Sequence, residues 1–351
     1  MMKKNKVLIV SLSNIFTTPY INYYLIQDES LEYDLFYWNR ENIDENTDFA
    51  AHTIEFKSKK NFFSYFRFAS KLLKTIKSNN YDKIIFLHTL SAVLIAGYLS
   101  KKFKQKYIVD IRDYTLERNH IFFDREEKVI KNAYLTVISS PFYIHFLPKH
   151  YNYSVLHNFA KPVSLNKNVK RTNKIIVSNI GYIRFFEMNI KVLNYFKNDD
   201  RFLMKYVGHN SETIAKYCKE NNIHNVEFVG RFEPNDTPLY FSEADIVFNV
   251  YGNSDISLDY ALSNKLYYAA FFKKPILVSK NTAMEELSIK YGFGITFDEK
   301  ETIADDVYNK YIGFQKDFDS VSKKCDSFID DVMNTNNNTE KKIKAFLEIE
   351  R

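Results

Sequence analysis

The stretch that most constrains the fold is residues 255–294, which reads DISLDYALSNKLYYAAFFKKPILVSKNTAMEELSIKYGFG. A polar loop leads to Ser263, and the residues after it predict a helical stretch that ends near Phe272. Pro275 stops that helix because proline has no backbone N–H to donate. The apolar strand 276–278 follows at once. A helix, a short turn and a buried strand make half of a βαβ unit, so the stretch predicts an α/β fold with a parallel sheet.

The start of this helix has the chemistry of an anion site. Ser263, Asn264 and Lys265 offer free backbone N–H groups, the positive end of a helix dipole and one ammonium group. We expect a diphosphate to bind there. The alternative is an ordinary helix start, with Ser263 as the cap and Lys265 as a solvated lysine.

Strands and helices alternate along the whole chain, and the pattern restarts near its middle. Apolar runs such as residues 6–10 do not alternate cleanly, which favours parallel strands that are covered on both faces. Each half is therefore predicted to be doubly wound, with ligands at the carboxyl ends of its strands. Strands are predicted at 6–11, 33–37, 83–87, 106–111, 135–138, 154–156, 174–178, 202–207, 226–229, 246–249, 275–279 and 294–297. Helices are predicted at 62–77, 92–102, 124–132, 188–196, 212–221 and 258–272.

The length of 351 residues favours two domains, because single cores stop growing at about 250–300 residues. Residues 160–173 are polar and without periodicity, so they are predicted to be the linker. The acidic helical tail is expected to be interrupted at 334–339, which reads NTNNNT. The expected divisions are a first domain at 1–165, a second at 166–320 and a helical tail at 321–351.

Composition argues against a chain that spans a membrane and against a disulfide scaffold. No segment approaches the ~20 apolar residues of a spanning helix, and the first apolar run, which stops at Val10, is a buried strand rather than a signal peptide. The two cysteines, Cys218 and Cys325, match no metal-ligand spacing. We therefore expect a cytoplasmic protein.

The net charge of +6 is unevenly distributed along the chain. Residues 1–165 hold 23 Lys and Arg against 16 Asp and Glu, whereas residues 166–351 hold 26 Lys and Arg against 27 Asp and Glu.

Six short motifs follow one another through the second half, and each lies at the end of a predicted element. They are Gly181-Tyr-Ile-Arg184, Val207-Gly208, Phe228-Val229-Gly230-Arg231-Phe232, Ala244-Asp245-Ile246, Asn264-Lys265-Leu266-Tyr267 and Gly292-Phe-Gly294. Their succession resembles the nucleotide-sugar domain of a GT-B glycosyltransferase, nearest to glycosyltransferase family 4. The resemblance spans most of the chain and implies a GT-B fold, in which two Rossmann-like doubly wound parallel-sheet domains face a cleft. It also implies that the first domain binds the acceptor and the second binds the donor.

The resemblance assigns donor-binding roles to residues of the second half. Arg184, after Gly181, would grip diphosphate oxygens with its planar guanidinium group. Lys265 and the amides around it would hold the same diphosphate as the sugar leaves, in place of a metal. The loop of Gly230, Arg231 and Phe232 would frame the uracil base. The alternatives are a surface role for Arg184 and core packing for Phe232.

Two departures from the family pattern concern acidic and glycine positions. Tyr260 and Tyr268 stand where family 4 carries its Glu-x7-Glu pattern, and Tyr268 would hold the ribose hydroxyls more weakly than a glutamate. Asp255 and Asp259 are nearby acidic substitutes. The Lys-Gly pair usual after the first loop is Glu187-Met188 here.

In the first half, two polar residues end predicted strands. His88 follows one strand and Asp113 follows the next, in the sequence Asp-Ile-Arg-Asp. We expect one or both to contact the donor sugar or the acceptor hydroxyl as catalytic groups. The alternatives are a turn cap paired to Arg112 for Asp113 and a packing role for His88.

A basic aromatic stretch, residues 57–77, carries seven Lys and Arg and no acid. As a helix it places Phe62, Phe66, Ala69, Leu73 and Ile76 on one stripe. Such a helix can lie in an anionic membrane interface, or it can bury its stripe in a Rossmann domain. The interface candidates are Lys59, Lys60, Phe62, Phe63, Phe66 and Arg67.

These observations predict a retaining, metal-independent hexosyltransferase that transfers sugar from a nucleotide diphosphate, most simply UDP, to a glycan hydroxyl. The expected partners are the donor and a glycan or polyprenyl-diphosphate-linked oligosaccharide acceptor in bacterial capsule, exopolysaccharide or O-antigen synthesis. A peripheral contact with the cytoplasmic face of the inner membrane is expected, with no nucleic-acid partner and no cofactor or metal. The alternatives are an enzyme like the UDP-sugar 2-epimerases and a non-catalytic nucleotide-sugar-binding partner of another transferase. The chain lacks the glycine loops of dehydrogenases and P-loop ATPases.

Overall fold

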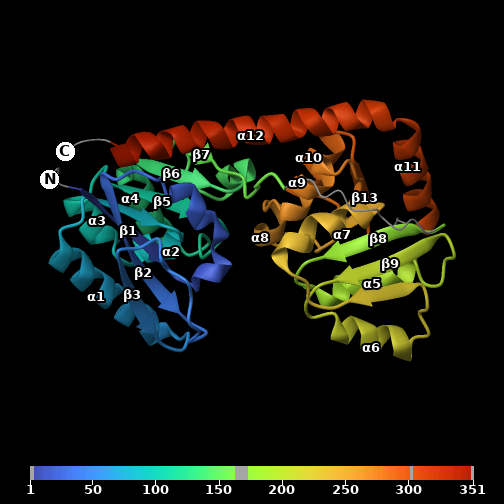
Figure 1. Cartoon of the computed structure of the whole chain (residues 1–351), viewed down its shortest axis with the longest axis horizontal. Helices are drawn as coiled ribbons and strands as arrows, with labels where there is room; N and C mark the ends of the chain where they lie inside the picture. Colours follow the sequence, from blue (N-terminus) through green and yellow to red (C-terminus); the bar gives the residue numbers. More distant parts are fainter. Residues whose placement is uncertain (1–3, 163–172, 301–302, 349–351) are drawn as a thin grey trace. The chain divides into compact units, whose positions relative to one another are not determined.

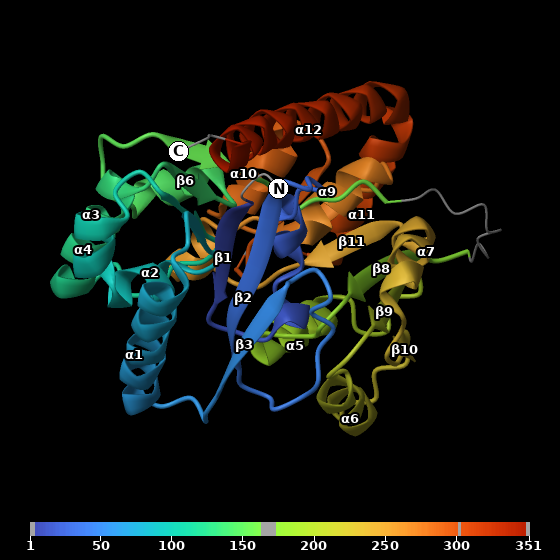
Figure 2. The same ribbon diagram turned by 60° about the vertical axis from the view of Figure 1, so that its left-hand side comes forward.

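Two wholly parallel sheets organise the chain. The structure is a computed structural model that describes residues 4–162, 173–300 and 303–348. A seven-stranded sheet has the order β3-β2-β1-β4-β5-β6-β7, and a six-stranded sheet has the order β10-β9-β8-β11-β12-β13. Every pair of neighbouring strands runs parallel (Figures 1 and 2). In each sheet the first strand lies inside and the order reverses beside it, which is the doubly wound arrangement that the sequence predicted.

The elements of the first unit follow the predicted boundaries closely, with one strand added. Its strands are β1 (Asn5–Ser11), β2 (Leu31–Asn39), β3 (His52–Lys57), β4 (Lys83–Phe86), β5 (Tyr107–Ile111), β6 (Leu135–Ile138) and β7 (Tyr153–Val155). Its helices are η1 (Ile15–Thr17), η2 (Pro19–Tyr24), α1 (Phe62–Asn79), α2 (Thr89–Leu94), α3 (Ala96–Lys102), α4 (His120–Asn132) and η3 (Pro141–His145).

The second unit repeats the architecture. Its strands are β8 (Ile175–Ile180), β9 (Phe202–Val207), β10 (Val226–Val229), β11 (Ile246–Asn249), β12 (Ile276–Ser279) and β13 (Gly294–Phe297). Its helices are α5 (Phe186–Tyr195), α6 (Glu212–Glu220), η4 (Pro234–Asp236), α7 (Thr237–Glu243), α8 (Ile256–Asp259), α9 (Asn264–Phe271), α10 (Ala283–Lys290) and α11 (Ala304–Lys316), followed by α12 (Phe318–Glu348).

Two predicted helices are in fact broken. The stretch 92–102 belongs to α2 and α3, which are separated at Ile95, and the stretch 258–272 belongs to α8 and α9. The second break has a local cause, since Ser263 adopts an extended conformation and its hydroxyl accepts a hydrogen bond from the N–H of Lys265 at 3.3 Å. Ser263 is therefore the N-cap of α9, which is part of the alternative interpretation of this helix start.

Each sheet is covered on both faces, because successive side chains of a strand point to opposite sides. In the first unit, Val7 and Ile9 of β1 pack with Phe346 of α12. On the other face, Phe36 and Trp38 of β2 contact Phe68 of α1, with ring centroids 5.0 and 5.8 Å apart. In the second unit, α9, α10 and α12 cover one face and α5 and α6 cover the other.

The chain divides into two compact units, and the last helix contributes to both. The first unit contains residues 1–157 and 334–351, and the second contains residues 158–333. The sequence-based boundaries lay at 165/166 and 320/321. The predicted linker, 160–173, lies mostly outside the described residues.

The predicted interruption at 334–339 is wrong, because α12 continues through it (Figure 1). Two polar residues of this run, Asn336 and Thr339, face the edge strand β7 and the residues after it. Asn336 donates to the carbonyl of His157 at 3.0 Å and accepts from its N–H at 2.7 Å. Thr339 donates to the carbonyl of Val155 at 2.6 Å. The run therefore covers a free sheet edge instead of ending a helix.

Phe346 is predicted to be essential to the first unit because it is 1% exposed in that unit's core. Replacing it with alanine should lower the free energy of unfolding by about 3–5 kcal/mol. Urea unfolding followed by Trp38 fluorescence measures this directly, since Trp38 is the sole tryptophan and is buried in the first unit.

The matched control for that experiment is Lys344→Ala, two residues before Phe346 on the exposed side of α12. It should change the same free energy by less than about 0.5 kcal/mol. Equal effects of the two substitutions would contradict the docking of α12 in the first unit's core.

Candidate functional site

The topology predicts that a ligand would bind at one edge of each sheet. In a doubly wound sheet, ligands bind at the carboxyl ends of the strands, where the strand order reverses. In the first unit that point lies between β1 and β4, and in the second it lies between β8 and β11. The loops after these four strands begin at Leu12, Leu87, Gly181 and Val250. They contain several of the residues that the sequence singled out.

Gly181 lies where the backbone leaves β8, and it needs to be glycine. Its φ is +111°, and no atom lies within 4 Å of where a Cβ would be. The neighbouring loop after β9 approaches it so closely that a Cβ on Gly208 would lie 2.0 Å from the carbonyl oxygen of Gly181. The two glycines therefore let the two loops meet and leave the backbone of Gly181 uncovered.

Lys265 is buried rather than solvated. Only 6% of the residue is exposed. Its ammonium group donates to the side-chain oxygen of Asn179 at 2.6 Å and to the carbonyl of Phe248 at 3.2 Å. These acceptors belong to β8 and β11, so the charge lies at the reversal point of the sheet. Among the residues that the structure describes, the third N–H group of Lys265 has no acceptor.

A chain of side-chain amides joins Lys265 to the loop that carries Arg184. Asn179 donates to the side-chain oxygen of Asn189 at 2.9 Å. Asn189 in turn donates to the carbonyl of Arg184 at 2.6 Å and to that of Phe185 at 2.9 Å. These bonds hold Phe185 in a left-handed conformation with φ of 57°, which costs a non-glycine residue energy.

An aromatic residue that follows β11, Tyr251, contacts this group of residues. Its ring lies 4.7 Å from the ring of Phe185, measured between centroids. The ammonium of Lys265 lies 5.3 Å from the centre of the same Tyr251 ring, within the range of a cation–π contact. Ser279 fixes this loop by accepting hydrogen bonds from the N–H groups of Tyr251 and Gly252.

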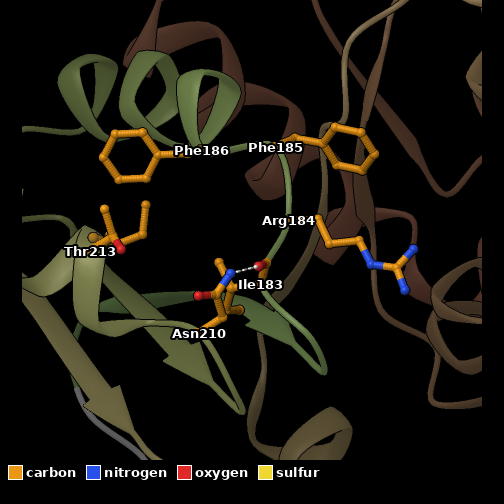
Figure 3. A pocket seen from close by; sticks show the side chains of 7 residues that line it. Ile183, Arg184, Phe185, Phe186, Asn210 and Thr213 are labelled. Atoms are coloured by element: carbon orange, nitrogen blue, oxygen red, sulfur yellow. Dashed lines mark hydrogen bonds between the residues drawn. The ribbon is translucent and has the colours of Figure 1, made fainter. Parts of the chain in front are cut away.

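A small pocket of about 140 Å³ lies beside the loop that follows β8 (Figure 3). It is lined by Ile183, Arg184, Phe185, Phe186, Asn210, Thr213 and Ile214. The side chains of Arg184 and Phe185 point away from Phe186 and Thr213. The guanidinium of Arg184 is exposed and lies 5.5 Å from the ring centre of Tyr182.

The Gly230-Arg231-Phe232 loop follows β10, at the edge of the same sheet. Gly230 and Arg231 are exposed. Phe232 is half-buried and packs on Tyr240 of α7, with centroids 4.9 Å apart. Phe232 thus has a packing partner, and its role at a base remains a prediction.

The two acidic substitutes have local partners. Asp255 caps α8 by accepting from the N–H of Ser257 at 2.8 Å. Asp259 accepts from the N–H of Ser254 at 2.9 Å, and burial, with a smaller contribution from Asp255, raises its pKa. Tyr268 packs its ring on Phe241 of α7 at 4.7 Å, and burial raises the pKa of its hydroxyl.

In the first unit, His88 follows β4 and is held as a neutral ring. Its Nδ1 accepts from the N–H of Leu12 at 3.2 Å, so the proton resides on Nε2. Nε2 lies 3.4 Å from the hydroxyls of Ser13 and Tyr20. Burial, aided by the charges of Arg40 and Arg112, lowers the pKa of His88 to about 3. At neutral pH this histidine therefore offers an N–H donor and no charge.

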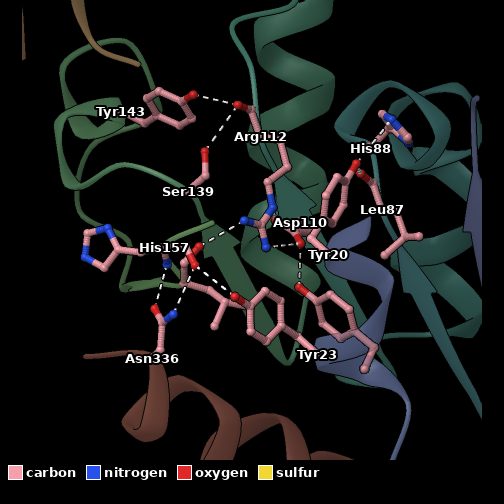
Figure 4. Close-up of polar contacts among 12 residues, drawn as sticks. Tyr20, Tyr23, Leu87, His88, Asp110, Arg112, Ser139, Tyr143, His157 and Asn336 are labelled. Carbon is pink, nitrogen blue, oxygen red and sulfur yellow. Dashed lines mark hydrogen bonds and ion pairs between the residues drawn. The ribbon is translucent and has the colours of Figure 1, made fainter. Parts of the chain in front are cut away.

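Arg112 forms an ion pair with Asp110, which lies two residues before it, in β5 (Figure 4). Its Nε and Nη2 lie 2.7 and 2.8 Å from the two oxygens of the buried Asp110 carboxylate, which also accepts from Tyr24. Nη1 donates to the carbonyl of Leu156. The pair therefore ties β5 to η2 and to the end of β7.

Asp113 lies just beyond this pair and is exposed. Burial and, secondly, the Asp113 carboxylate raise the pKa of Tyr143, which places Asp113 near that tyrosine. Asp113 and His88 both lie at the carboxyl edge of the first sheet. Their catalytic roles remain predictions.

Most of the basic aromatic stretch lies in α1, and its stripe packs only in part, because Ala69 and Ile76 are buried whereas Phe62 and Phe66 are exposed. The buried residues of α1 are Ser64, Phe68, Ala69, Leu72, Thr75 and Ile76. Phe62, Phe63 and Phe66 are 71%, 74% and 56% exposed, and Lys59, Lys60 and Arg67 are also exposed. Phe68 and Leu72 pack in the core, and each lies one position away from a residue of the expected stripe.

Other predicted features can be placed briefly. In the described ranges, no group of three or more His, Cys, Asp or Glu side chains could hold a metal ion, and no helix is long and apolar enough to cross a membrane. Cys218 and Cys325 are free and buried. Sequence reasoning missed Asn179, Asn189 and Tyr251. A polar residue inside the apolar strand IIVSNI was the one available signal for Asn179.

Comparison with known proteins identifies the fold. No family model and no curated protein matches the chain. Several solved structures do match the chain. HepE from Anabaena in complex with UDP matches with TM-score 0.67 and 12% identity, over 97% of this chain and 100% of that one. Sucrose-phosphate synthase from Thermosynechococcus elongatus matches with TM-score 0.65 and 13% identity, over 98% and 95% of the two chains. The lipopolysaccharide outer core galactosyltransferase WaaB matches with TM-score 0.62 and 14% identity, over 95% and 98%. The two units thus have the GT-B fold.

Asn189 is predicted to support the loop that follows β8. Asn189→Ala should lower the stability of the second unit by about 2–3 kcal/mol, because it leaves buried carbonyl and amide groups unpaired. Circular dichroism during urea unfolding measures the loss, with Trp38 fluorescence as the reference for the first unit. Asn194→Ala is the control, since Asn194 lies on the exposed side of the same helix. A loss no larger than that of the control would contradict the network.

His88 is predicted to make the protein less stable in acid. The pKa of about 3 lies below the ordinary value of 6.5, so between these values the unfolded chain binds a proton that the folded chain does not. Stability therefore falls with decreasing pH, by about 1.4 kcal/mol per pH unit between pH 6 and 4 for this group. His88→Gln should remove that part of the slope in Trp38-detected urea unfolding.

The control for the pH experiment is the exposed His224, replaced by glutamine. This substitution removes a surface histidine and leaves the buried His88 and its contacts in place. An unaltered slope in His88→Gln would show that the imidazole is protonated in the folded state.

Proposed function

We propose that the protein is a glycosyltransferase that transfers a sugar from a nucleotide diphosphate to a hydroxyl group. The observation that carries this proposal is the convergence of Lys265, the uncovered backbone of Gly181 and the loop of Arg184 at the point where the second sheet's strand order reverses. This combination offers one buried ammonium and one exposed guanidinium. A diphosphate needs such partners, both when it binds and when it leaves with more negative charge.

UDP is the donor nucleotide that we propose. HepE, which shares the fold, was solved with UDP and with UDP-glucose. The third N–H group of Lys265 and the guanidinium of Arg184 would take the diphosphate oxygens. The loop of Gly230, Arg231 and Phe232 would hold the base. We propose a retaining reaction without metal or other cofactor, in which the leaving phosphate accepts the proton of the acceptor.

For the acceptor and the cellular role, we propose a class of molecule and a class of pathway. We propose a glycan acceptor, free or linked to a polyprenyl diphosphate, in the synthesis of a bacterial surface polysaccharide at the cytoplasmic face of the membrane. His88 would donate its Nε2 proton to a sugar or acceptor oxygen, since its Nδ1 is occupied by the N–H of Leu12. Asp113, exposed at the same edge of the first sheet, would accept from the acceptor hydroxyl.

A non-catalytic role that keeps nucleotide-sugar binding is the second candidate. The observation in its favour is Tyr268, whose ring packs against Phe241 at a position where the family has a glutamate. If this candidate is correct, the protein binds UDP but neither hydrolyses UDP-sugars nor transfers the sugar.

Thermal shift with nucleotides tests the donor site. UDP at ~100 times its dissociation constant should stabilise the protein by ~2.7 kcal/mol, which gives a readable rise in Tm. Arg184→Ala should weaken binding about tenfold and remove about half of that stabilisation. Because Arg184 is exposed, its loss should leave the fold intact.

The control is Lys216→Ala on α6, since Lys216 is an exposed cation of the same unit. Its UDP-induced shift should equal that of the wild type. If none of UDP, GDP, CMP, ADP and dTDP raises the Tm of the wild type, the donor site is wrong.

A further inference from the structure

The amino-terminal part of α1 carries an aromatic surface that the fold does not use. Phe62, Phe63 and Phe66 are 71%, 74% and 56% exposed. Their rings contact one another, with centroids 5.9 Å apart for Phe62 and Phe63 and 5.0 Å apart for Phe62 and Phe66. Single exposed apolar residues are ordinary, but three rings at one helix end, two of which contact the ring of Phe62, form a patch.

The helix beneath this patch is firmly anchored. Phe68 and Leu72 are fully buried, and Phe68 and Tyr65 pack against the ring of Trp38. The side chain of Asn61 caps the helix by accepting from the N–H of Ser64 at 2.9 Å. The three exposed rings are therefore held in place by a helix whose opposite face is already packed.

The charges around the rings all have one sign. Lys59, Lys60 and Arg67 are exposed beside them, and the sequence holds no acid between Glu55 and Asp82. Lys57 is paired with Glu55 at 2.9 Å, so it contributes less. Aromatic rings that enter the boundary of a bilayer, bordered by cations that remain among the headgroups, are the pattern of a helix that lies in an anionic membrane surface.

We propose that this patch, formed by Phe62, Phe63, Phe66, Lys59, Lys60 and Arg67, docks the protein on an anionic lipid bilayer. Charge complementarity selects this occupant, since a neutral or basic surface gains nothing from the three cations. The docking does not depend on the proposed transfer reaction, and it adds a physical contact that the donor site does not require.

The position of the patch gives the docking a use. Helix α1 begins four residues after the carboxyl end of β3, and in a parallel sheet every strand ends at the same edge. His88 and Asp113 follow β4 and β5 at that edge. A membrane-bound α1 would therefore bring the ligand-binding edge of the first unit near the lipid surface, where a lipid-linked acceptor would be presented.

Vesicle co-sedimentation of the full chain tests the proposal. The wild type should bind vesicles of phosphatidylcholine with phosphatidylglycerol and should not bind phosphatidylcholine alone. Serine at all three phenylalanine positions should weaken binding by at least tenfold. Glutamine at Lys59, Lys60 and Arg67 should weaken it about fivefold for each charge removed at low salt.

The matched control replaces Ile121, Ile144 and Ile289 with serine, because these side chains are 73%, 47% and 50% exposed outside the patch. This variant should bind vesicles as the wild type does. The UDP-induced rise in Tm, measured on every variant, reports the donor site separately and should not change.

Three results would overturn the docking. The first is a wild type that ignores anionic vesicles. The second is a triple-serine variant at Phe62, Phe63 and Phe66 that binds them as well as the wild type. The third is a wild type that sediments as a dimer without lipid and becomes a monomer in that variant, which would make the patch an interface between copies.

Discussion

The constraint on which the rest of the structure depends is that all strands of each sheet run in the same direction. A parallel strand cannot return through a tight turn, so each connection crosses a face of the sheet, usually as a helix. Both faces are thereby buried, and every strand ends at one edge. In the first sheet the loops that begin at that edge contain His88 and Asp113, and in the second sheet they contain Gly181 and Tyr251. Within each sheet, loops that are far apart in sequence therefore begin at the same edge.

The site edges are held by buried polar groups that are costly unless every partner is present. Lys265 is buried with Asn179 and a backbone carbonyl, and Arg112 is buried with Asp110. A buried charge is tolerated when hydrogen bonds satisfy it, and its geometry is then difficult to change. These interactions give the loops fixed positions before any ligand arrives. Fixed positions reduce the ordering cost of binding.

Tyr268, at a position where the family that the sequence resembles carries a glutamate, illustrates the same rule. The ring of Tyr268 lies against the rings of Phe241 and Phe272, with centroid distances of 4.7 and 6.5 Å, and Phe159 lies at its edge. A carboxylate surrounded by those rings would need a compensating donor, whereas a tyrosine ring packs there without one. A tyrosine at this position therefore agrees with the aromatic rings around it.

Sequence analysis could predict the strands because a parallel strand needs an apolar run, and such runs are visible. It missed β3, whose sequence HTIEFK has one buried residue, because an edge strand is covered less. It predicted the helix start at Ser263 from capping chemistry. It could not predict the link from Asn179 to Asn189, because an amide in a strand does not reveal which helix faces it. It did not predict which residues of α1 pack on the sheet, because either of two adjacent stripes could have done so.

The run NTNNNT shows how a polar sequence can be structural. Asn336 and Thr339 are buried because they bond to the backbone at the edge of the first sheet. The last helix is thus made after the whole second unit, yet it completes the core of the first. During synthesis, Val7 and Ile9 on the apolar face of β1 cannot pack against Phe346 until residues 158–333 have been translated. The order of folding is therefore not the order of translation, and the first unit is the last to be finished.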